Sequence, residues 1–223
     1  MKTTVPFTTI EQIRPHVARD LLRIEAVTLS PEAPFTWASG LKAPLYCDNR
    51  LTMSYPTVRF MLTRGFLTLL REHTLKPDAI VGTATAGIPH AAWLAQALDL
   101  PMAYVRSKPK AHGRGNQIEG RIAPGQQVVV VEDLVSTGMS SMGSIEALRT
   151  AGAEVAALLA IFTYGLPGVA ARFEEASVPF FTLTTFDTLL AVAYEDRHLS
   201  EDDLRSLKAW QRDPEAWSQA HSG

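Results

Sequence analysis

The 223-residue sequence has few residues that could build a covalent or metal-based scaffold. It contains a single cysteine, Cys47, so an internal disulfide and a zinc site made of several cysteines are both excluded. We interpret Cys47 as a small buried strand residue rather than a nucleophile. The six histidines show no close pair at metal-ligand spacing, so we expect no metal that is held directly by protein side chains.

An excess of positive charge and a long apolar run are also missing. Lys and Arg number 21 against 23 Asp and Glu, so there is no basic field that would attract nucleic acid or an anionic membrane. No segment approaches the ~20 apolar residues of a membrane span, and the start of the chain lacks the apolar core of a secretion signal. We expect a cytoplasmic protein without nucleic-acid or membrane partners, in which any anion site is local.

From residue 78 onward, short apolar runs alternate with helical patterns. The apolar runs lie at 78–82, 100–105, 126–133, 154–164 and 178–185, and the helical patterns at 86–99 and 141–151. This alternation is typical of repeated βαβ units, so the sequence predicts an α/β fold with a mostly parallel, doubly wound sheet.

The flanking segments differ from this core, which we place at 76–185. Residues 1–75 predict a helix from about Ile13 to Leu29, a turn-rich hood at 34–50 and an amphipathic helix at 58–73. Residues 186–223 form a tail with two predicted helices, the second capped by Ser200. At this length and an apolar content of 46%, we expect one compact domain overall.

The stretch VVVVEDLVSTGMSS at 128–141 carries the strongest chemical signal. Four valines indicate a strand that is buried on both faces, and Glu132 and Asp133 are expected at its carboxyl end, where α/β sheets bind ligands. The small residues that follow would offer backbone N–H groups and a helix N-terminus to an anion. The combination predicts a ligand with phosphate at one end and sugar hydroxyls or a hydrated cation at the other.

Two further segments point to the same edge of the sheet. The turn at 82–92 contains Gly82 and Gly87 and could aim N–H groups inward, although tight strand–helix packing alone would also explain it. The polar loop at 104–127 exceeds the ~12–15 residues of ordinary connections, so it is either a solvated basic loop or a cationic lid. We favour the lid because both neighbouring strands end at the predicted phosphate site. Its cations are Arg106, Lys108, Lys110, His112, Arg114 and Arg121.

These motifs resemble those of the type I phosphoribosyltransferases. More narrowly, FTWASG, LYCDNR, GTATAGIPHAAW, YVRSKPKAHGRGNQIEG and IFTYGL together resemble the orotate phosphoribosyltransferases, over roughly residues 20 to 212. The resemblance implies a type I phosphoribosyltransferase fold with a hood, magnesium as cofactor, and a homodimer in which the lid is shared between subunits. It implies transfer of phosphoribose from 5-phosphoribosyl 1-diphosphate to orotate in pyrimidine biosynthesis. A purine phosphoribosyltransferase and a non-catalytic phosphoribosyl-diphosphate sensor remain the alternatives.

The resemblance also implies residue roles. Glu132 and Asp133 would hold the ribose hydroxyls and stabilise an oxocarbenium-like transition state, and Asp133 would also contact magnesium through water. Lys110 would stabilise the leaving diphosphate, and His112 would either protonate it or donate a hydrogen bond. The residues with an implied contact to phosphoribosyl diphosphate are Thr85, Ala86, Arg106, Lys110, His112, Glu132, Asp133, Leu134, Val135, Ser136, Thr137, Gly138, Met139 and Ser140.

Recognition of orotate departs from the better-studied form of the family. Cations of that form are replaced by Ala38, Ala86, Ser107 and Tyr164 in this chain. Ser136 and hood backbone groups would hold the pyrimidine edge. The remaining cations near the hood and lid, each either an anion contact or a surface charge, are Lys42, Arg50 and Lys108.

Overall fold

The structure is a computed structural model of the chain and describes residues 8–37, 39–107 and 117–222. The predictions made for Ala38, Lys108, Lys110, His112 and Arg114 lie outside the described residues.

The centre of the molecule is a six-stranded sheet with the order β10-β9-β8-β5-β6-β7. The pairings from β10 through β6 are parallel, and β7 runs antiparallel to β6. This arrangement confirms the predicted mostly parallel α/β sheet, whereas β7, which lies inside the predicted loop, was not expected. The strands are β5 (Ala79–Thr83), β6 (Met102–Val105), β7 (Ile118–Glu119), β8 (Gln127–Val135), β9 (Glu154–Thr163) and β10 (Phe180–Thr185).

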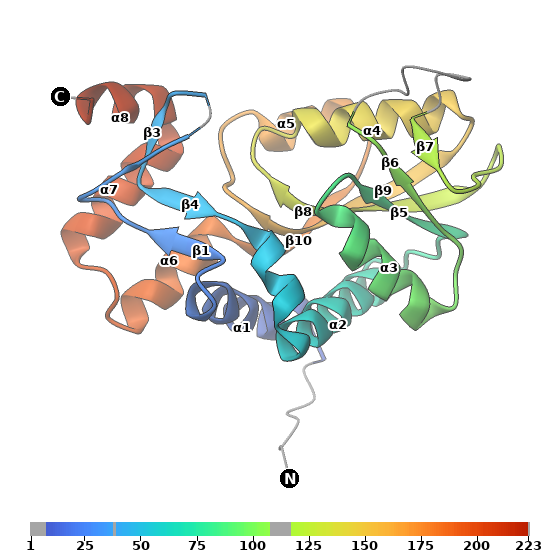
Figure 1. The fold of residues 1–223 in the computed structure, drawn as a ribbon, viewed down its shortest axis with the longest axis horizontal. Coiled ribbons are helices and arrows are strands. Elements are labelled where there is room, and N and C mark those ends of the chain that lie inside the picture. The colour runs from blue at the N-terminus through green and yellow to red at the C-terminus, as the bar shows by residue number, and fades with distance from the viewer. Residues whose placement is uncertain (1–7, 38, 108–116, 223) are drawn as a thin grey trace, which may run out of the picture.

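Helices cover both faces of this sheet (Figure 1). One face is covered by α1 (Ile10–Arg23), α2 (Pro56–Glu72) and α3 (Gly87–Leu98), and the other by α4 (Met139–Thr150) and α5 (Val169–Glu175). The side chains of β8 alternate between the two resulting cores: Val129 and Val131 belong to the first, and Val128 and Val130 to the second. The valine run is therefore a strand buried on both faces, as predicted.

The hood is made of two small antiparallel sheets beside the main one (Figure 1). β1 (Val27–Leu29) pairs with β4 (Leu45–Cys47), and β2 (Phe35–Thr36) pairs with β3 (Lys42–Ala43). A 3-10 helix, η1 (Asn49–Ser54), then leads from β4 to α2. The C-terminal tail packs against the hood, where the Ser218 hydroxyl accepts a 2.8 Å hydrogen bond from the backbone N–H of Lys42. The tail helices are α6 (Phe186–Glu195), α7 (Glu201–Arg212) and α8 (Pro214–Ala220).

The first predicted helix was too long at its C-terminal end. The helix ends at Arg23, because Glu25 adopts φ +57°, in the left-handed region, and the chain turns into β1. The short helices α5 and α8 were also not predicted. Ser200 caps α7 as expected, since its side chain accepts from the Asp203 N–H in a capping box.

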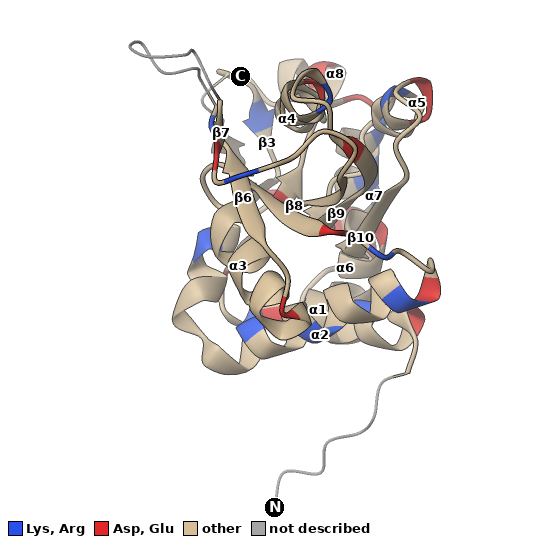
Figure 2. Ribbon diagram, turned by 90° about the vertical axis from the view of Figure 1, so that its right-hand side faces the viewer, with Lys and Arg blue, Asp and Glu red and all other residues tan. Residues whose placement is uncertain are grey.

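Charges of both signs are interspersed on α1, α2 and α5 (Figure 2). Within the described residues, no helix is long and apolar enough to cross a membrane.

Candidate active site

The acid pair lies on β8, close to its carboxyl end. The strand continues through both acids to Val135, so the prediction that it ends at Glu132 and Asp133 was short by two residues. Glu132 is only 6% exposed, and one of its carboxylate oxygens accepts a 3.1 Å hydrogen bond from the Asp133 N–H. Burial, reinforced by the neighbouring Asp133, raises the pKa of Glu132 to about 8. Burial also raises the pKa of Asp133.

The predicted phosphate-binding turn directly follows β8. Gly138 adopts φ +79° and forms the N-cap of α4, so the turn needs a residue that tolerates a left-handed backbone. The first amides of α4 have no partner within the helix and are available to an anion. Thr137, Met139 and Ser140 are exposed at this turn, and Ser136 is half-buried.

The turn between β5 and α3 is pressed against β8. A Cβ on Gly87 would lie 2.6 Å from the Thr83 hydroxyl and closer still to the Val131 carbonyl oxygen, so only glycine fits. This close approach brings the start of α3 beside the strand of the acid pair. The turn contains a cis peptide between Ala84 and Thr85, and Ala86 is the N-cap of α3.

A cavity of about 280 Å³ lies between these two turns. Its lining includes Ala84, Arg106, Ser140 and Ser144. The guanidinium of Arg106 is 3.5 Å from the carboxylate of Glu119 on β7, which holds the start of the predicted lid beside the cavity.

A second cavity, of about 550 Å³, lies under the hood. Ser136 and Leu134 line it from β8 and the following turn, while Trp37 and Tyr46 line it from the hood. Tyr164 forms part of the wall, is 3% exposed and stacks on Trp37 with ring centroids 5.4 Å apart. Burial raises the pKa of the Tyr164 hydroxyl well above its ordinary value, so this residue presents a neutral aromatic surface.

The two cations predicted to bind orotate do not line this cavity. The ammonium of Lys42 donates a 2.9 Å hydrogen bond to the hydroxyl of Thr36, which does line it. Arg50 makes two hydrogen bonds, of 2.6 and 2.8 Å, to the carboxylate of Asp48. Lys42 is therefore one side chain away from the cavity, whereas Arg50 is engaged by a neighbouring acid. Their roles stay predictions.

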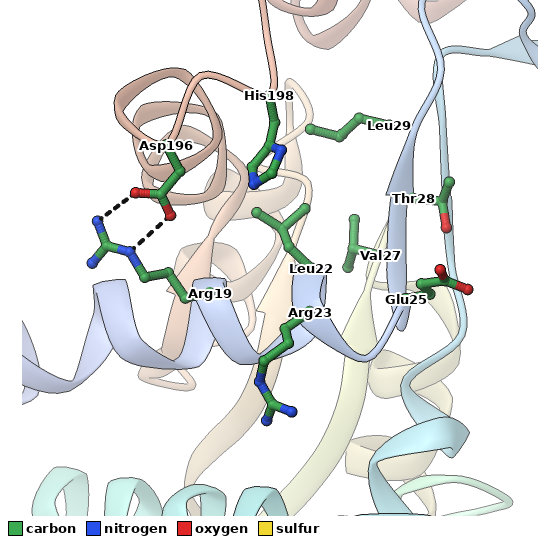
Figure 3. A pocket seen from close by; sticks show the side chains of 9 residues that line it. All are labelled: Arg19, Leu22, Arg23, Glu25, Val27, Thr28, Leu29, Asp196 and His198. Atoms are coloured by element: carbon green, nitrogen blue, oxygen red, sulfur yellow. Dashed lines mark hydrogen bonds and ion pairs between the residues drawn. The ribbon is translucent and has the colours of Figure 1, made fainter.

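A larger cavity, of about 700 Å³, lies away from these turns, between α1, β1 and the end of α6 (Figure 3). In it, the guanidinium of Arg19 is hydrogen-bonded to the carboxylate of Asp196. None of the residues predicted to bind a substrate lines this cavity.

Sequence reasoning missed one residue of the site, Asn49. Its side chain is 1% exposed and donates a 2.7 Å hydrogen bond to the backbone carbonyl of Asp133. The only signal for it was its place in LYCDNR, where a polar residue follows a hood strand.

Two turns predicted to bind phosphate lie beside β8, the strand of the acid pair, and residues 60–172 match the phosphoribosyl transferase domain, which places the chain among the phosphoribosyl-transferring enzymes. The chain is 54% identical over 203 residues to an orotate phosphoribosyltransferase of Bacillus pumilus, a match that covers 90% of this chain and 96% of that protein. A second relative, from Bacillus subtilis, is 54% identical over 200 residues, or 90% of this chain and 93% of that protein. The chain belongs to the orotate phosphoribosyltransferase family.

Solved structures agree with this assignment. Orotate phosphoribosyltransferase from Aeropyrum pernix superimposes with a TM-score of 0.70 at 29% identity, over 82% of this chain and 99% of that one. The UMP synthase of Leishmania donovani gives a TM-score of 0.74 at 28% identity, over 88% of this chain and 42% of that one.

Proposed function

We propose that this chain transfers phosphoribose from 5-phosphoribosyl 1-diphosphate to orotate, forming orotidine 5′-monophosphate and diphosphate in pyrimidine biosynthesis. The observation that carries the proposal is that two cavities adjoin the end of β8, the strand of the acid pair: Leu134 and Ser136 line one, and Met139 and Ser140 line the other. The hood cavity has aromatic walls suited to a planar base, and the other cavity lies between two turns suited to phosphate. Ribose held at Glu132 and Asp133 would then have its C1 carbon between an incoming base and a departing diphosphate.

The acid pair would supply both binding and electrostatic stabilisation. Carboxyl oxygens that accept from the ribose 2′- and 3′-hydroxyls would hold the sugar in place. Bound Mg²⁺ would favour the ionised forms of both acids, and their negative charge would then lie near the carbon that becomes positive in an oxocarbenium-like transition state. The turn at 136–140 would hold the 5′-phosphate through backbone N–H groups and hydroxyls. Ser136, which also lines the hood cavity, would contact the pyrimidine edge.

Three residues of the lid, Arg106, Lys110 and His112, would receive the diphosphate. Arg106 lines the smaller cavity together with Ala84, which belongs to the turn that carries Thr85 and Ala86. In the proposal, Lys110 stabilises the charge that develops on the leaving group, and His112 either protonates it or donates a hydrogen bond. A closed lid would also exclude the water that hydrolyses the donor.

The lid proposal can be tested with Lys110→Ala. We expect turnover to fall by about 10² to 10³, as for loss of one preorganised electrostatic contact, while donor binding to the free enzyme changes less. Arg121→Ala is the matched control, because Arg121 is an exposed cation at the far end of the same loop. Equal turnover of the two variants would remove Lys110 from the reaction.

The donor set of the site fits magnesium. Mg²⁺ prefers phosphate oxygens and retains several waters, so it needs one or two nearby carboxylates rather than a protein cage. Glu132 and Asp133 supply such carboxylates, and the described residues contain no cluster of three or more His, Cys, Asp or Glu that would hold a metal by itself. We propose that Asp133 contacts the ion through water, and that the ion neutralises diphosphate charge when bound.

We also propose a cytoplasmic homodimer in which each lid reaches the partner's site. Support comes from four large apolar side chains that are exposed on η1, on the start of α2 and between these helices: Leu51, Met53, Tyr55 and Phe60. Phe60 is 62% exposed, and apolar side chains that gather on a surface are typical of contact regions between proteins. A cytoplasmic location is supported by the substrates, since phosphorylated sugars carry charges that do not cross membranes.

The deciding assay follows the ultraviolet absorbance of orotate with purified protein, magnesium and phosphoribosyl diphosphate, with uracil, adenine, hypoxanthine and xanthine in parallel. Loss of orotate that depends on both donor and magnesium is the expected result. Turnover of a purine instead would identify a purine phosphoribosyltransferase. Donor binding without turnover of any base would identify a sensor.

A further inference from the structure

A buried hydrogen-bond chain connects α3, η1 and β8 beneath the site. The side-chain amide nitrogen of Asn49 lies 2.7 Å from the backbone carbonyl oxygen of Asp133, and the backbone carbonyl of Asn49 accepts a 2.6 Å hydrogen bond from the Thr52 hydroxyl. The Thr52 oxygen lies 3.3 Å from Nε2 of His90. Exposures of 1%, 0% and 2% for Asn49, Thr52 and His90 show that water does not compete for these bonds.

Donors and acceptors along this chain have one consistent assignment. Thr52 has a single O–H, which it gives to Asn49, so its oxygen accepts from His90 and places the proton on Nε2. The Asp133 carbonyl only accepts, so the Asn49 side chain must present its NH₂ group and not its oxygen. The Asn49 side-chain oxygen consequently has no partner among the described residues. A buried acceptor without a partner lowers stability. The favourable contribution of the Asn49 side chain must therefore come from the hydrogen bond that its NH₂ group donates to Asp133.

The Asn49 contact joins two parts of the site that come from different elements. On the hood side, β4 carries Tyr46 and Cys47 of the base cavity wall, three and two residues before Asn49. On the sheet side, the bonded carbonyl belongs to the peptide between Asp133, which faces the ribose in the proposed reaction, and Leu134, which lines the base cavity. One hydrogen bond thus connects the base wall to the strand of the acid pair.

We propose that Asn49 is a positioning residue of the transfer reaction, which fixes the distance between the base cavity and the ribose-binding acid pair. The reaction joins a base nitrogen to the ribose C1, and such steps require reacting atoms ~3–3.5 Å apart in the bound state. A hood that is loosely attached to β8 would bind either substrate but would bring the two together less often. This inference rests on the ribose-binding role proposed above for Asp133.

The test compares Asn49→Ala with Thr184→Val as a matched control. Thr184 is fully buried on β10, and its hydroxyl also lacks a partner among the described residues, so its loss probes a general change in the core. For N49A we expect kcat to fall by about 10²-fold, as for a misplacement of ~1 Å, while the KM values for orotate and donor change little. For T184V we expect wild-type kinetics. Equal kcat values for N49A and T184V would overturn the inference.

A double-mutant cycle separates positioning from general destabilisation. If Asn49 acts through Asp133, the losses of kcat in N49A and D133N will not add in the double variant, whereas independent effects add. Additive losses would overturn the inference. If N49A does not fold, Thr52→Val keeps the asparagine but removes the hydroxyl that donates to its backbone carbonyl. A wild-type kcat for T52V would overturn the inference as well. Full activity of D133N would instead refute the proposed role of the acid pair, whatever the result for Asn49.

Discussion

Gly87, at the start of α3, should be the glycine whose replacement most disturbs the close contact between α3 and β8. A Cβ at this position would lie 2.6 Å from the Thr83 hydroxyl oxygen and would overlap the Val131 carbonyl oxygen, which belongs to rigid strand backbone. Relief requires α3 to move away from β8, and such overpacking typically costs about 1–3 kcal/mol. For a chain of this length, about 2 kcal/mol corresponds to a decrease in Tm of about 4–8 °C.

The matched control is Gly143→Ala, in the exposed part of α4. A Cβ there meets no atom within 4 Å, and alanine is favoured over glycine in a helix by about 1 kcal/mol, so Tm should rise. Differential scanning calorimetry measures both variants. Because Gly143 lines the smaller cavity, this control is compared for stability alone. A G87A protein with wild-type Tm would show that α3 does not depend on close contact with β8, and the reasoning about this turn would then be wrong.

Three further predictions concern the acid pair, the phosphate turn and the exposed apolar surface. The folded, ligand-free protein holds a proton on Glu132 up to a pKa of about 8, whereas the unfolded chain releases it near 4.5, so the free energy of unfolding should fall as pH rises between these values. Denaturant titrations at several pH values should show this decrease of the free energy of unfolding, and the decrease should be smaller in E132Q. An equal decrease in E132Q would show that other groups cause it. Gly138→Ala places a side chain on a residue with φ +79°, so we expect the KM for the donor to rise and the free energy of unfolding to fall by about 1 kcal/mol. Steady-state kinetics and thermal melts measure the two effects, and an unchanged KM would exclude the turn from donor binding. Phe60→Glu should shift a dimer to monomer in sedimentation velocity, and a dimer that persists would place the contact elsewhere.

The parts of the fold that follow a periodic pattern could be predicted from the sequence. Four consecutive valines have one stable environment, a strand with a core on each side, and Val128 to Val131 occupy it. The short antiparallel strand β7 could not be predicted, because two residues carry no period and its pairing depends on Tyr104 and Val105 of β6. The early end of α1 was missed for a related reason: the left-handed conformation of Glu25 is set by packing, and glutamate gives no local signal for it.

Asn49 illustrates the limit for site residues. Its function depends on a backbone carbonyl 84 positions later in the chain, and a backbone acceptor has the same chemistry in every residue. The acid pair, in contrast, could be predicted, because two adjacent carboxylates at the end of an apolar strand are unfavourable there unless they bind something. A charged side chain in an unfavourable place can thus be recognised from the sequence as a candidate site residue, whereas a side chain that bonds only to backbone cannot.

The hood cavity bears on how an anionic base is recognised. Among the residues that the structure describes, those that line it, which include Trp37, Tyr46 and Tyr164, contain no charged side chain. Stacked aromatic walls hold a planar ring whatever its charge, so they do not by themselves distinguish orotate from uracil. The distinction requires a cation at the edge of the cavity, and among the described residues the ammonium of Lys42 is linked to that edge through the Thr36 hydroxyl, whereas Arg50 is already paired with Asp48. Lys42 is therefore the stronger of the two candidates for the contact with the orotate carboxylate. Its flexible side chain could reach the edge of the cavity by rotation, without a rearrangement of the hood.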